Sequence, residues 1–256
     1  MSESKTILLD IGNTRLKWGV LSDGCISRTG SIDHVTLQEK GFAALTTRLP
    51  TKVDNVIASN VAGATFATRL SGVVGIHCNC VIQYVRSRRS GFGLTNGYTN
   101  PRQFGVDRWV AMVGARAEFE TALCVVDAGT AVTIDAIEKS GRHLGGLIVP
   151  GVDLIGSGFL KNANIAPVPK KHPRMPATGL GIFAKNTHSA VYNGALSAAC
   201  GAIEHSVRAL RSGGQRPKIV LTGGDASRIL KQIDGKFIHR PHLVLQGLAH
   251  MAQNES

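Results

Sequence analysis

The fold is decided by one stretch, Val125-Val126-Asp127-Ala128-Gly129-Thr130-Ala131-Val132-Thr133-Ile134. An apolar run ends in Asp-Ala-Gly-Thr and a second apolar run follows at once, which predicts a β-hairpin with a tight turn of small residues. Gly129 lets the backbone approach a ligand, and Thr130 adds a hydroxyl beside the turn amides, so the turn suits phosphate oxygens. Asp127, at the strand end, can hold a cation that accompanies phosphates. Asp-Gly turns without a function are also common, so this stretch alone leaves both interpretations open.

A second copy of the pattern strengthens the phosphate interpretation. The stretch Ile7-Leu8-Leu9-Asp10-Ile11-Gly12-Asn13-Thr14 has the same order of residue types, and Leu16, Trp18 and Val20 then alternate as in a strand. Asp10 and Asp127 are 117 positions apart, which is roughly one domain length and longer than the ~20–50-residue period of a solenoid. We therefore expect a duplicated domain, 1–118 and 119–256, whose two phosphate hairpins face each other across an interdomain cleft.

Composition indicates a globular protein. The 256 residues are 43% hydrophobic and 18% charged, so a real core is expected and general disorder is not. No apolar run approaches the ~20 residues of a membrane span. The first five residues lack the form of a signal peptide, so we expect a cytoplasmic protein.

The net charge of +12 admits two interpretations, nucleic-acid binding or a basic surface that attracts anionic substrates. Basic residues cluster at Arg86-Ser-Arg-Arg89 and at Lys170-Lys-His-Pro-Arg174. Neither cluster is interleaved with aromatic residues and no nucleic-acid motif appears, so we do not expect a direct nucleic-acid function.

The cysteines are an odd, scattered set, which favours reduced thiols. They are Cys25, Cys78, Cys80, Cys124 and Cys200. The run His77-Cys78-Asn79-Cys80 lacks a second ligand pair at zinc spacing, so we do not expect a metal there.

In the first half, a strand meander over 6–31 is followed by alternating helices and strands, which is typical of an α/β fold. We expect helices at 36–48 and 62–70 and strands at 55–59 and 81–85. Residues 86–106 are rich in glycine and polar residues and predict a long, functional loop. Asp107 follows at the start of a helix, where it can serve a reaction or simply favour the helix macrodipole.

The second half repeats the meander at 122–127, 132–137 and 143–149 and continues with a helix at 189–211. Ala190, Gly194, Ala195 and Ala198 give this helix a small-residue face for close packing. A strand at 218–221 ends in Thr222-Gly-Gly-Asp-Ala226, and a helix at 227–233 starts at once. Such a junction can receive a nucleotide base or sugar, although it is also a common structural feature of α/β folds.

Five motifs in order resemble those of the type III pantothenate kinases, some of whose relatives were named Bvg accessory factors. They are Asp10-Ile-Gly-Asn-Thr14, Gly105-Val-Asp-Arg108, Asp127-Ala-Gly-Thr-Ala-Val-Thr133, Gly145-Gly-Leu-Ile-Val-Pro-Gly151 and Thr222-Gly-Gly-Asp-Ala226. The resemblance covers nearly the whole chain. It implies the actin-like ATPase fold, with two ribonuclease H-like domains around an ATP cleft. It also implies transfer of the γ-phosphoryl group of ATP to the terminal hydroxyl of pantothenate, the first step toward coenzyme A.

The resemblance further implies roles for particular residues. Asp10 would hold Mg²⁺, which prefers oxygen ligands, and Asp127 a monovalent cation, potassium or ammonium. Asp107 would accept the hydroxyl proton; its ordinary pKa of ~3.9 makes a weak base, which suffices if the proton leaves late. Arg108 would bind the pantothenate carboxylate or orient the site. The implied ATP-binding residues are Asp10, Ile11, Gly12, Asn13, Thr14, Arg15, Lys17, Gly129, Thr130, Thr133 and Gly223, of which Lys17 can instead point to solvent. The implied pantothenate-binding residues are Tyr98, Asn100, Gly105, Val106, Asp107, Arg108 and Thr187.

The resemblance implies a homodimer with composite sites, in which the long helix of the second half lies in the interface and Thr187 reaches the partner's pantothenate site. Two alternatives remain. Another kinase or ATPase of the same fold would share both phosphate hairpins without requiring Gly105-Val-Asp-Arg108. A transcription accessory factor could keep the fold and lose the chemistry, but Asp10, Asp107 and Asp127 are all present, which favours an enzyme.

Overall fold

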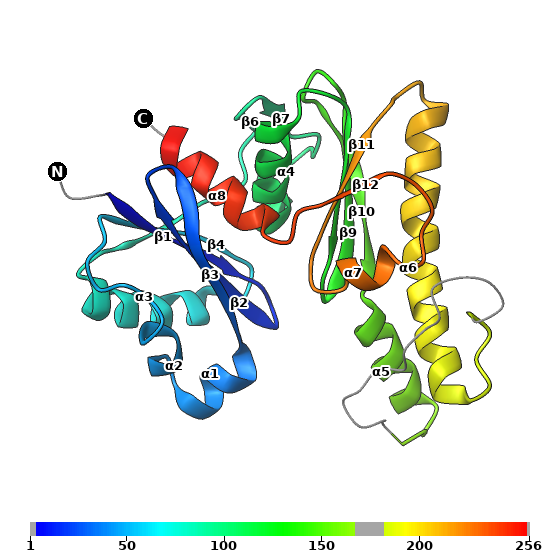
Figure 1. The fold of residues 1–256 in the computed structure, drawn as a ribbon, viewed down its shortest axis with the longest axis horizontal. Coiled ribbons are helices and arrows are strands. Elements are labelled where there is room, and N and C mark those ends of the chain that lie inside the picture. The colour runs from blue at the N-terminus through cyan, green and yellow to red at the C-terminus, as the bar shows by residue number, and fades with distance from the viewer. Residues whose placement is uncertain (1–3, 167–181, 255–256) are drawn as a thin grey trace. The chain divides into compact units, whose positions relative to one another are not determined.

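The structure, a computed structural model, describes residues 4–166 and 182–254, which form two compact units (Figure 1). The first unit holds the described residues up to Phe119 and those from His242 onward, and the second is Glu120–Pro241. No helix in the described ranges is long and apolar enough to span a bilayer. The second basic cluster of the sequence, 170–174, lies outside the described residues.

The first unit is built on a five-stranded sheet with the order β3-β2-β1-β4-β5. Its strands are β1 (Lys5–Ile11), β2 (Arg15–Ser22), β3 (Cys25–Asp33), β4 (Asn55–Asn60) and β5 (Ile82–Tyr84). The first three strands form an antiparallel meander, whereas β4 and β5 run parallel to β1. A tight turn at Asp23 and Gly24, both of which have positive φ, connects β2 to β3.

The sheet of the second unit repeats this topology strand for strand, in the order β10-β9-β8-β11-β12. Its strands are β8 (Leu123–Ala128), β9 (Ala131–Ile137), β10 (His143–Pro150), β11 (Lys218–Thr222) and β12 (Phe237–His239). Again the first three are antiparallel and the last two run parallel to the first. The duplication expected from the two Asp-x-Gly hairpins is therefore confirmed.

Successive side chains along a strand point to opposite faces of the sheet, so the core residues and the candidate site residues of each unit lie on opposite faces. In β1, Ile7, Leu9 and Ile11 belong to a hydrophobic cluster that also includes residues of the helices between β3 and β5. Because successive side chains of a strand point to opposite faces, Asp10 lies on the other face. The same rule places Asp127 opposite the core of the second unit, which contains its neighbours in β8.

The helices of the first unit differ in places from the predicted ones. The single helix expected at 36–48 is two, α1 (His34–Lys40) and α2 (Ala43–Thr46), because Gly41 adopts φ 68° and ends the first. The helix α3 (Ala64–Cys78) extends beyond the predicted residue 70 and ends at Asn79 in the left-handed conformation. The helix α4 (Val106–Glu118) has Asp107 in its first turn, as the sequence predicted.

The C-terminal helix α8 (Leu243–Asn254) packs against α4 in the first unit, although the sequence assigned 119–256 to one domain. Two glycines explain the close packing. A Cβ built on Gly114 of α4 would lie 2.6 Å from the Leu243 carbonyl oxygen, and one built on Gly247 of α8 would collide with the Val110 backbone. The C-terminal segment carries no motif, and its packing depends on contacts distant in sequence.

The helices of the second unit are α5 (Val152–Asn162), α6 (Thr187–Ser212) and α7 (Ala226–Ile229). The long α6 provides Ala195, Ala199 and Ile203 to the core cluster beside β8, β9 and β11 (Figure 1). It is longer than the predicted 189–211 because the side chain of Asn186 accepts a hydrogen bond from the Ser189 amide and caps its N-terminus.

Candidate active site

Asp10 is a buried carboxylate at the end of β1, with only 8% of its surface exposed. Its Oδ1 accepts a hydrogen bond from the Ser59 hydroxyl at 3.1 Å. Parallel pairing places Asp10 beside Ser59 of β4, so the two side chains share one face of the sheet. Ser59 is itself 1% exposed. The sequence analysis missed this residue, which only the register of two distant strands could have identified.

The turn after Asp10 is closed by its glycine. The amide of Gly12 donates to the Arg15 carbonyl at 3.1 Å, and a Cβ on Gly12 would lie 3.2 Å from that oxygen. The glycine amide is therefore used within the hairpin and does not face a ligand. Asn13, Thr14 and Arg15 are exposed, which leaves them accessible to a ligand. Ile11 is fully buried in the core, so only its backbone can take part.

Lys17 lies opposite Asp10 in the antiparallel pairing of β1 and β2, on the same face of the sheet. Burial lowers the pKa of His242, and the positive charge of Lys17 lowers it further.

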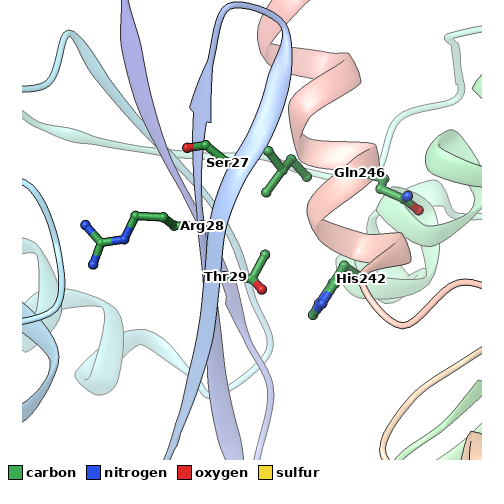
Figure 2. Close-up of a pocket in the computed structure, with 6 residues that line it drawn as sticks. Ser27, Arg28, Thr29, His242 and Gln246 are labelled. Carbon is green, nitrogen blue, oxygen red and sulfur yellow. The ribbon is translucent and has the colours of Figure 1, made fainter.

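His242 lines a surface pocket of about 280 Å³ together with Gln246 and residues 26–29 (Figure 2). The Arg28 guanidinium points away from the helix α8, and none of the predicted site residues lines this pocket.

Asp107 occupies the first turn of α4 and is half-buried. Its Oδ1 accepts a hydrogen bond from the Arg108 amide at 2.8 Å. A Cβ built on Gly105 would lie 2.7 Å from the same oxygen. A larger residue at 105 would therefore have to displace the Asp107 carboxylate, although the backbone φ of −55° and ψ of 129° suit any residue. Val106, between them, is half-buried as the first residue of the helix.

Arg108 is 5% exposed and is enclosed by aromatic residues. Its NH1 donates to the Tyr98 hydroxyl at 3.0 Å, and its guanidinium carbon lies 4.6 Å from the centre of the Phe104 ring. The Tyr98 and Phe104 rings meet edge to face with their centres 4.8 Å apart. The sequence analysis did not single out Phe104. Asn100 uses its side-chain oxygen to accept from the Arg102 amide, capping a short 3₁₀ helix at Pro101–Gln103.

In the second unit, Asp127 is the last residue but one of β8 and lies opposite Thr133 of β9 and Thr222 of β11. The three side chains share one face of the sheet, away from the core cluster. Thr222 is 1% exposed, and its hydroxyl has no hydrogen-bond partner within residues 4–166 and 182–254. A buried hydroxyl without a partner is costly, which makes this oxygen beside Asp127 a candidate ligand atom. The sequence analysis quoted Thr222 in a motif but gave it no role.

The second turn is braced from two sides by glycines. The amide of Gly129 closes the hairpin on the Ala131 carbonyl at 3.0 Å, and Thr130 is exposed. The Gly151 amide donates to the Thr130 carbonyl at 2.9 Å, and a Cβ on Gly151 would strike the turn backbone. Gly223, at φ 97°, lies so close to Asp127 that a Cβ would be 2.5 Å from its Oδ1. The motifs that end in Gly151 and that contain Gly223 therefore hold the hairpin in place.

Thr187 is exposed at the first residue of α6 in the second unit, whereas Asp107 and Tyr98 belong to the first. Along α6, Ala190, Gly194 and Ala198 are exposed, while Ala195 is buried in the core of the unit. The small-residue face that the sequence predicted is therefore a surface feature of α6 at three of its four positions.

The cysteines and a buried histidine–aspartate pair lie outside the predicted site. All five thiols are free, and burial raises the pKa of Cys124 to about 12 and that of Cys200 to about 11. In the described part of the chain, no group of three or more His, Cys, Asp or Glu side chains is arranged to hold a metal. His143 and Asp135 form a buried pair on β10 and β9, with Nε2 and Oδ1 2.9 Å apart.

Comparison with known proteins agrees with the arrangement of these motifs. The family model described as type III pantothenate kinase matches residues 6–209. A type III pantothenate kinase of Nitrosococcus oceani is 33% identical over 258 residues, covering 98% of this chain and 94% of that protein.

Two solved structures share the fold. A protein described as a Baf family transcriptional activator, from Campylobacter jejuni, superposes with a TM-score of 0.56 at 20% identity, covering 97% of this chain and 98% of that one. An inorganic polyphosphate/ATP-glucomannokinase from Arthrobacter gives a TM-score of 0.50 at 11% identity, covering 99% and 100%. At these identities the structures show the actin-like fold and no more.

Proposed function

The chain belongs to the type III pantothenate kinase family, and on this premise we propose how its residues carry out the reaction. The reaction is the ATP-dependent phosphorylation of pantothenate, the first step of coenzyme A synthesis. The roles are assigned on the basis of the repeated sheet topology of the two units. Each sheet carries an aspartate, Asp10 or Asp127, at the last residue but one of its first strand, beside a hairpin closed by a glycine amide.

The exposed residues of the two turns bind phosphate oxygens of ATP. Thr14 and Thr130 each place a hydroxyl at an exposed position of a turn. Arg15 and Lys17 add positive charge at the first turn, which suits the polyphosphate. Since Gly12 and Gly129 use their amides inside the hairpins, their contribution is the shape of the turn and close backbone approach.

Asp10 is the carboxylate suited to Mg²⁺. Its Oδ1 is fixed by the Ser59 hydroxyl, and a hard divalent cation prefers such an oxygen. Mg²⁺ held by Asp10 would supply positive charge that neutralises the negative charge developing on the transferred phosphoryl group. Ser59 would act by holding the carboxylate in one orientation.

Asp127 and Thr222 fit a monovalent cation. Their strands are paired at these two residues, and the buried Thr222 hydroxyl lacks a partner in the described residues. Gly223 packs so closely against the Ala128 backbone and the Asp127 carboxylate that a side chain at this position would collide with both. A carboxylate and a neutral hydroxyl oxygen are ligands that potassium or ammonium accepts.

Asp107 accepts the proton of the pantothenate hydroxyl. Phosphoryl transfer proceeds through a loose transition state, in which positioning and charge neutralisation dominate. The Arg108 amide donates to the carboxylate oxygen, and the glycine at 105 leaves the space that this oxygen occupies. Arg108 itself is bound by Tyr98 and Phe104, which supports the role of orienting the acceptor site more than free capture of a carboxylate.

The surface of the second unit supports a homodimer in which Thr187 contributes to the partner's acceptor site. The exposed stripe of Ala190, Gly194 and Ala198 permits close helix packing. Large apolar side chains are also exposed on this unit: Leu147, Ile148, Leu154, Phe159 and Phe183. Exposed apolar groups of this size commonly mark an interface. Light scattering should give about twice 27.1 kDa, and an active monomer would contradict the composite site.

The alternative of a transcription accessory factor is not favoured. Of the cluster at 86–89, Arg89 donates to two backbone carbonyls and Arg88 lies 5.8 Å from the centre of the Phe92 ring. These side chains are engaged within the chain. The direct test is incubation with pantothenate, ATP, Mg²⁺ and potassium, followed by mass detection of 4'-phosphopantothenate. Product with a sugar acceptor and none with pantothenate would instead indicate another kinase of this fold.

A further inference from the structure

Arg89 holds together the loop that precedes Asp107. Neither its place in the basic cluster at 86–89 nor the family resemblance gives this residue a role. The guanidinium of Arg89 donates to two consecutive backbone carbonyls, from NH1 to Tyr98 at 2.9 Å and from NH2 to Thr99 at 2.8 Å. Hydrogen bonds from a charged donor are stronger than neutral ones. This fork joins the beginning of the loop to the segment that presents Tyr98 and Asn100.

Further contacts close the same loop. Asn96, which is 2% exposed, receives a hydrogen bond at its Oδ1 from the Tyr98 amide at 3.0 Å. Its own amide donates to the Arg89 carbonyl at 2.8 Å, and its Nδ2 to the Arg88 carbonyl at 3.3 Å. At the far end, the Ser87 hydroxyl donates to the Phe104 carbonyl at 2.8 Å. Residues 87–89 therefore fix the backbone on both sides of the Tyr98 ring.

The Tyr98 side chain connects this restrained backbone to Arg108. Its hydroxyl accepts from Arg108 NH1 at 3.0 Å, and its edge-to-face contact with Phe104 completes the aromatic enclosure of the guanidinium. Because Arg108 follows Asp107 directly, the position of the loop and the position of the acceptor site are linked through one side chain.

We propose that Arg89 is a positioning residue for the acceptor substrate, acting through the backbone of Tyr98 and Thr99 and through the Tyr98–Arg108 contact. The proposal rests on the assignment of pantothenate as acceptor and deepens it. Arg89 lies outside the five family motifs and touches none of the phosphate turns. Its loss should weaken binding of the acceptor and leave binding of ATP unchanged.

The test compares Arg89→Gln with Arg86→Gln, which removes the same charge from an exposed residue of the same segment. Arg89→Gln should raise the KM for pantothenate about tenfold, with kcat changed less than about threefold and the KM for ATP unchanged, the pattern of lost ground-state binding. Arg86→Gln should leave all three constants within about twofold. Equal effects of the two variants, or a parallel rise in both KM values, would refute the proposal.

A double variant tests the route of action. If Arg89 acts through Tyr98, adding Arg89→Gln to Tyr98→Phe should raise the KM for pantothenate much less than it does in the wild-type background. Independent, multiplying effects would refute that route.

A third measurement needs no turnover. Amide hydrogen exchange over 96–104 should become faster in Arg89→Gln and stay unchanged in Arg86→Gln. Unchanged exchange in Arg89→Gln would show that the loop is not held by this side chain, and would overturn the proposal. Wild-type protein that fails to phosphorylate pantothenate would refute the proposed function, and the exchange result would still decide whether Arg89 holds the loop.

Discussion

Replacing Gly105 with alanine should displace the Asp107 carboxylate while leaving the identity of residue 107 unchanged. The added Cβ would lie 2.7 Å from Asp107 Oδ1, so the oxygen must retreat by about 0.7 Å to reach ordinary van der Waals contact. A misplacement of ~1 Å can cost about 10²-fold in rate, so kcat should fall about 10- to 100-fold. The backbone at φ −55° and ψ 129° accepts alanine. Loss of a glycine N-cap costs only about 1 kcal/mol, or about 2–4 °C in Tm.

The assay is steady-state kinetics with both substrates, together with a thermal melt of the same sample. Gly72→Ala is the matched control, because a Cβ built there meets no atom of the described residues within 4 Å beyond its chain neighbours and the backbone of its own helix. It should leave kcat unchanged. If Gly105→Ala keeps near-normal kcat while folded, the position of this carboxylate oxygen does not matter to the rate, and the role given to Asp107 is wrong.

Three further predictions concern the side chains beside Asp10 and Asp127 and the effect of pH. Ser59→Ala should lower affinity for Mg²⁺-ATP about 3- to 10-fold by releasing the Asp10 carboxylate from one hydrogen bond; unchanged affinity in a binding titration would remove that role. Thr222→Val should raise the potassium concentration needed both for activity and for a potassium-dependent rise in Tm, whereas identical titrations would exclude this hydroxyl as an Asp127 partner. Burial lowers the pKa of His34 from 6.5, so the unfolded chain binds the proton first and stability should be lost as the pH falls below about 6.5. His34→Phe should flatten the Tm profile between about pH 7 and 5, and an unchanged profile would refute the assignment.

Local patterns in the sequence were enough to predict the duplicated fold. Apolar runs ending in Asp-x-Gly recur in two places, and each begins an antiparallel meander in the structure. The strands and hairpins depend on near neighbours, so their residue types reveal them. The helix boundaries were less accurate, because they depend on single residues such as Gly41 and Asn186.

Contacts between segments distant in sequence could not be predicted. Ser59 reaches Asp10 through the register of two parallel strands. The packing of α8 on α4 depends on Gly114 and Gly247, and neither glycine belongs to a motif. The candidate residues themselves lie where their motifs suggested, at strand ends and at the start of α4. What the sequence missed is the set of side chains that holds them in place.

The central claim is that Asp107 is the base of the reaction, and Asp107→Asn tests it most directly. Asparagine keeps the side-chain oxygen that accepts from the Arg108 amide, so the local fold is expected to persist while basicity is lost. The measurement is kcat for pantothenate phosphorylation and Tm on the same preparation. We expect kcat to fall by ~10²–10⁴, with ATP affinity unchanged and a Tm shift of a few degrees at most. A folded variant with near-normal kcat would contradict it.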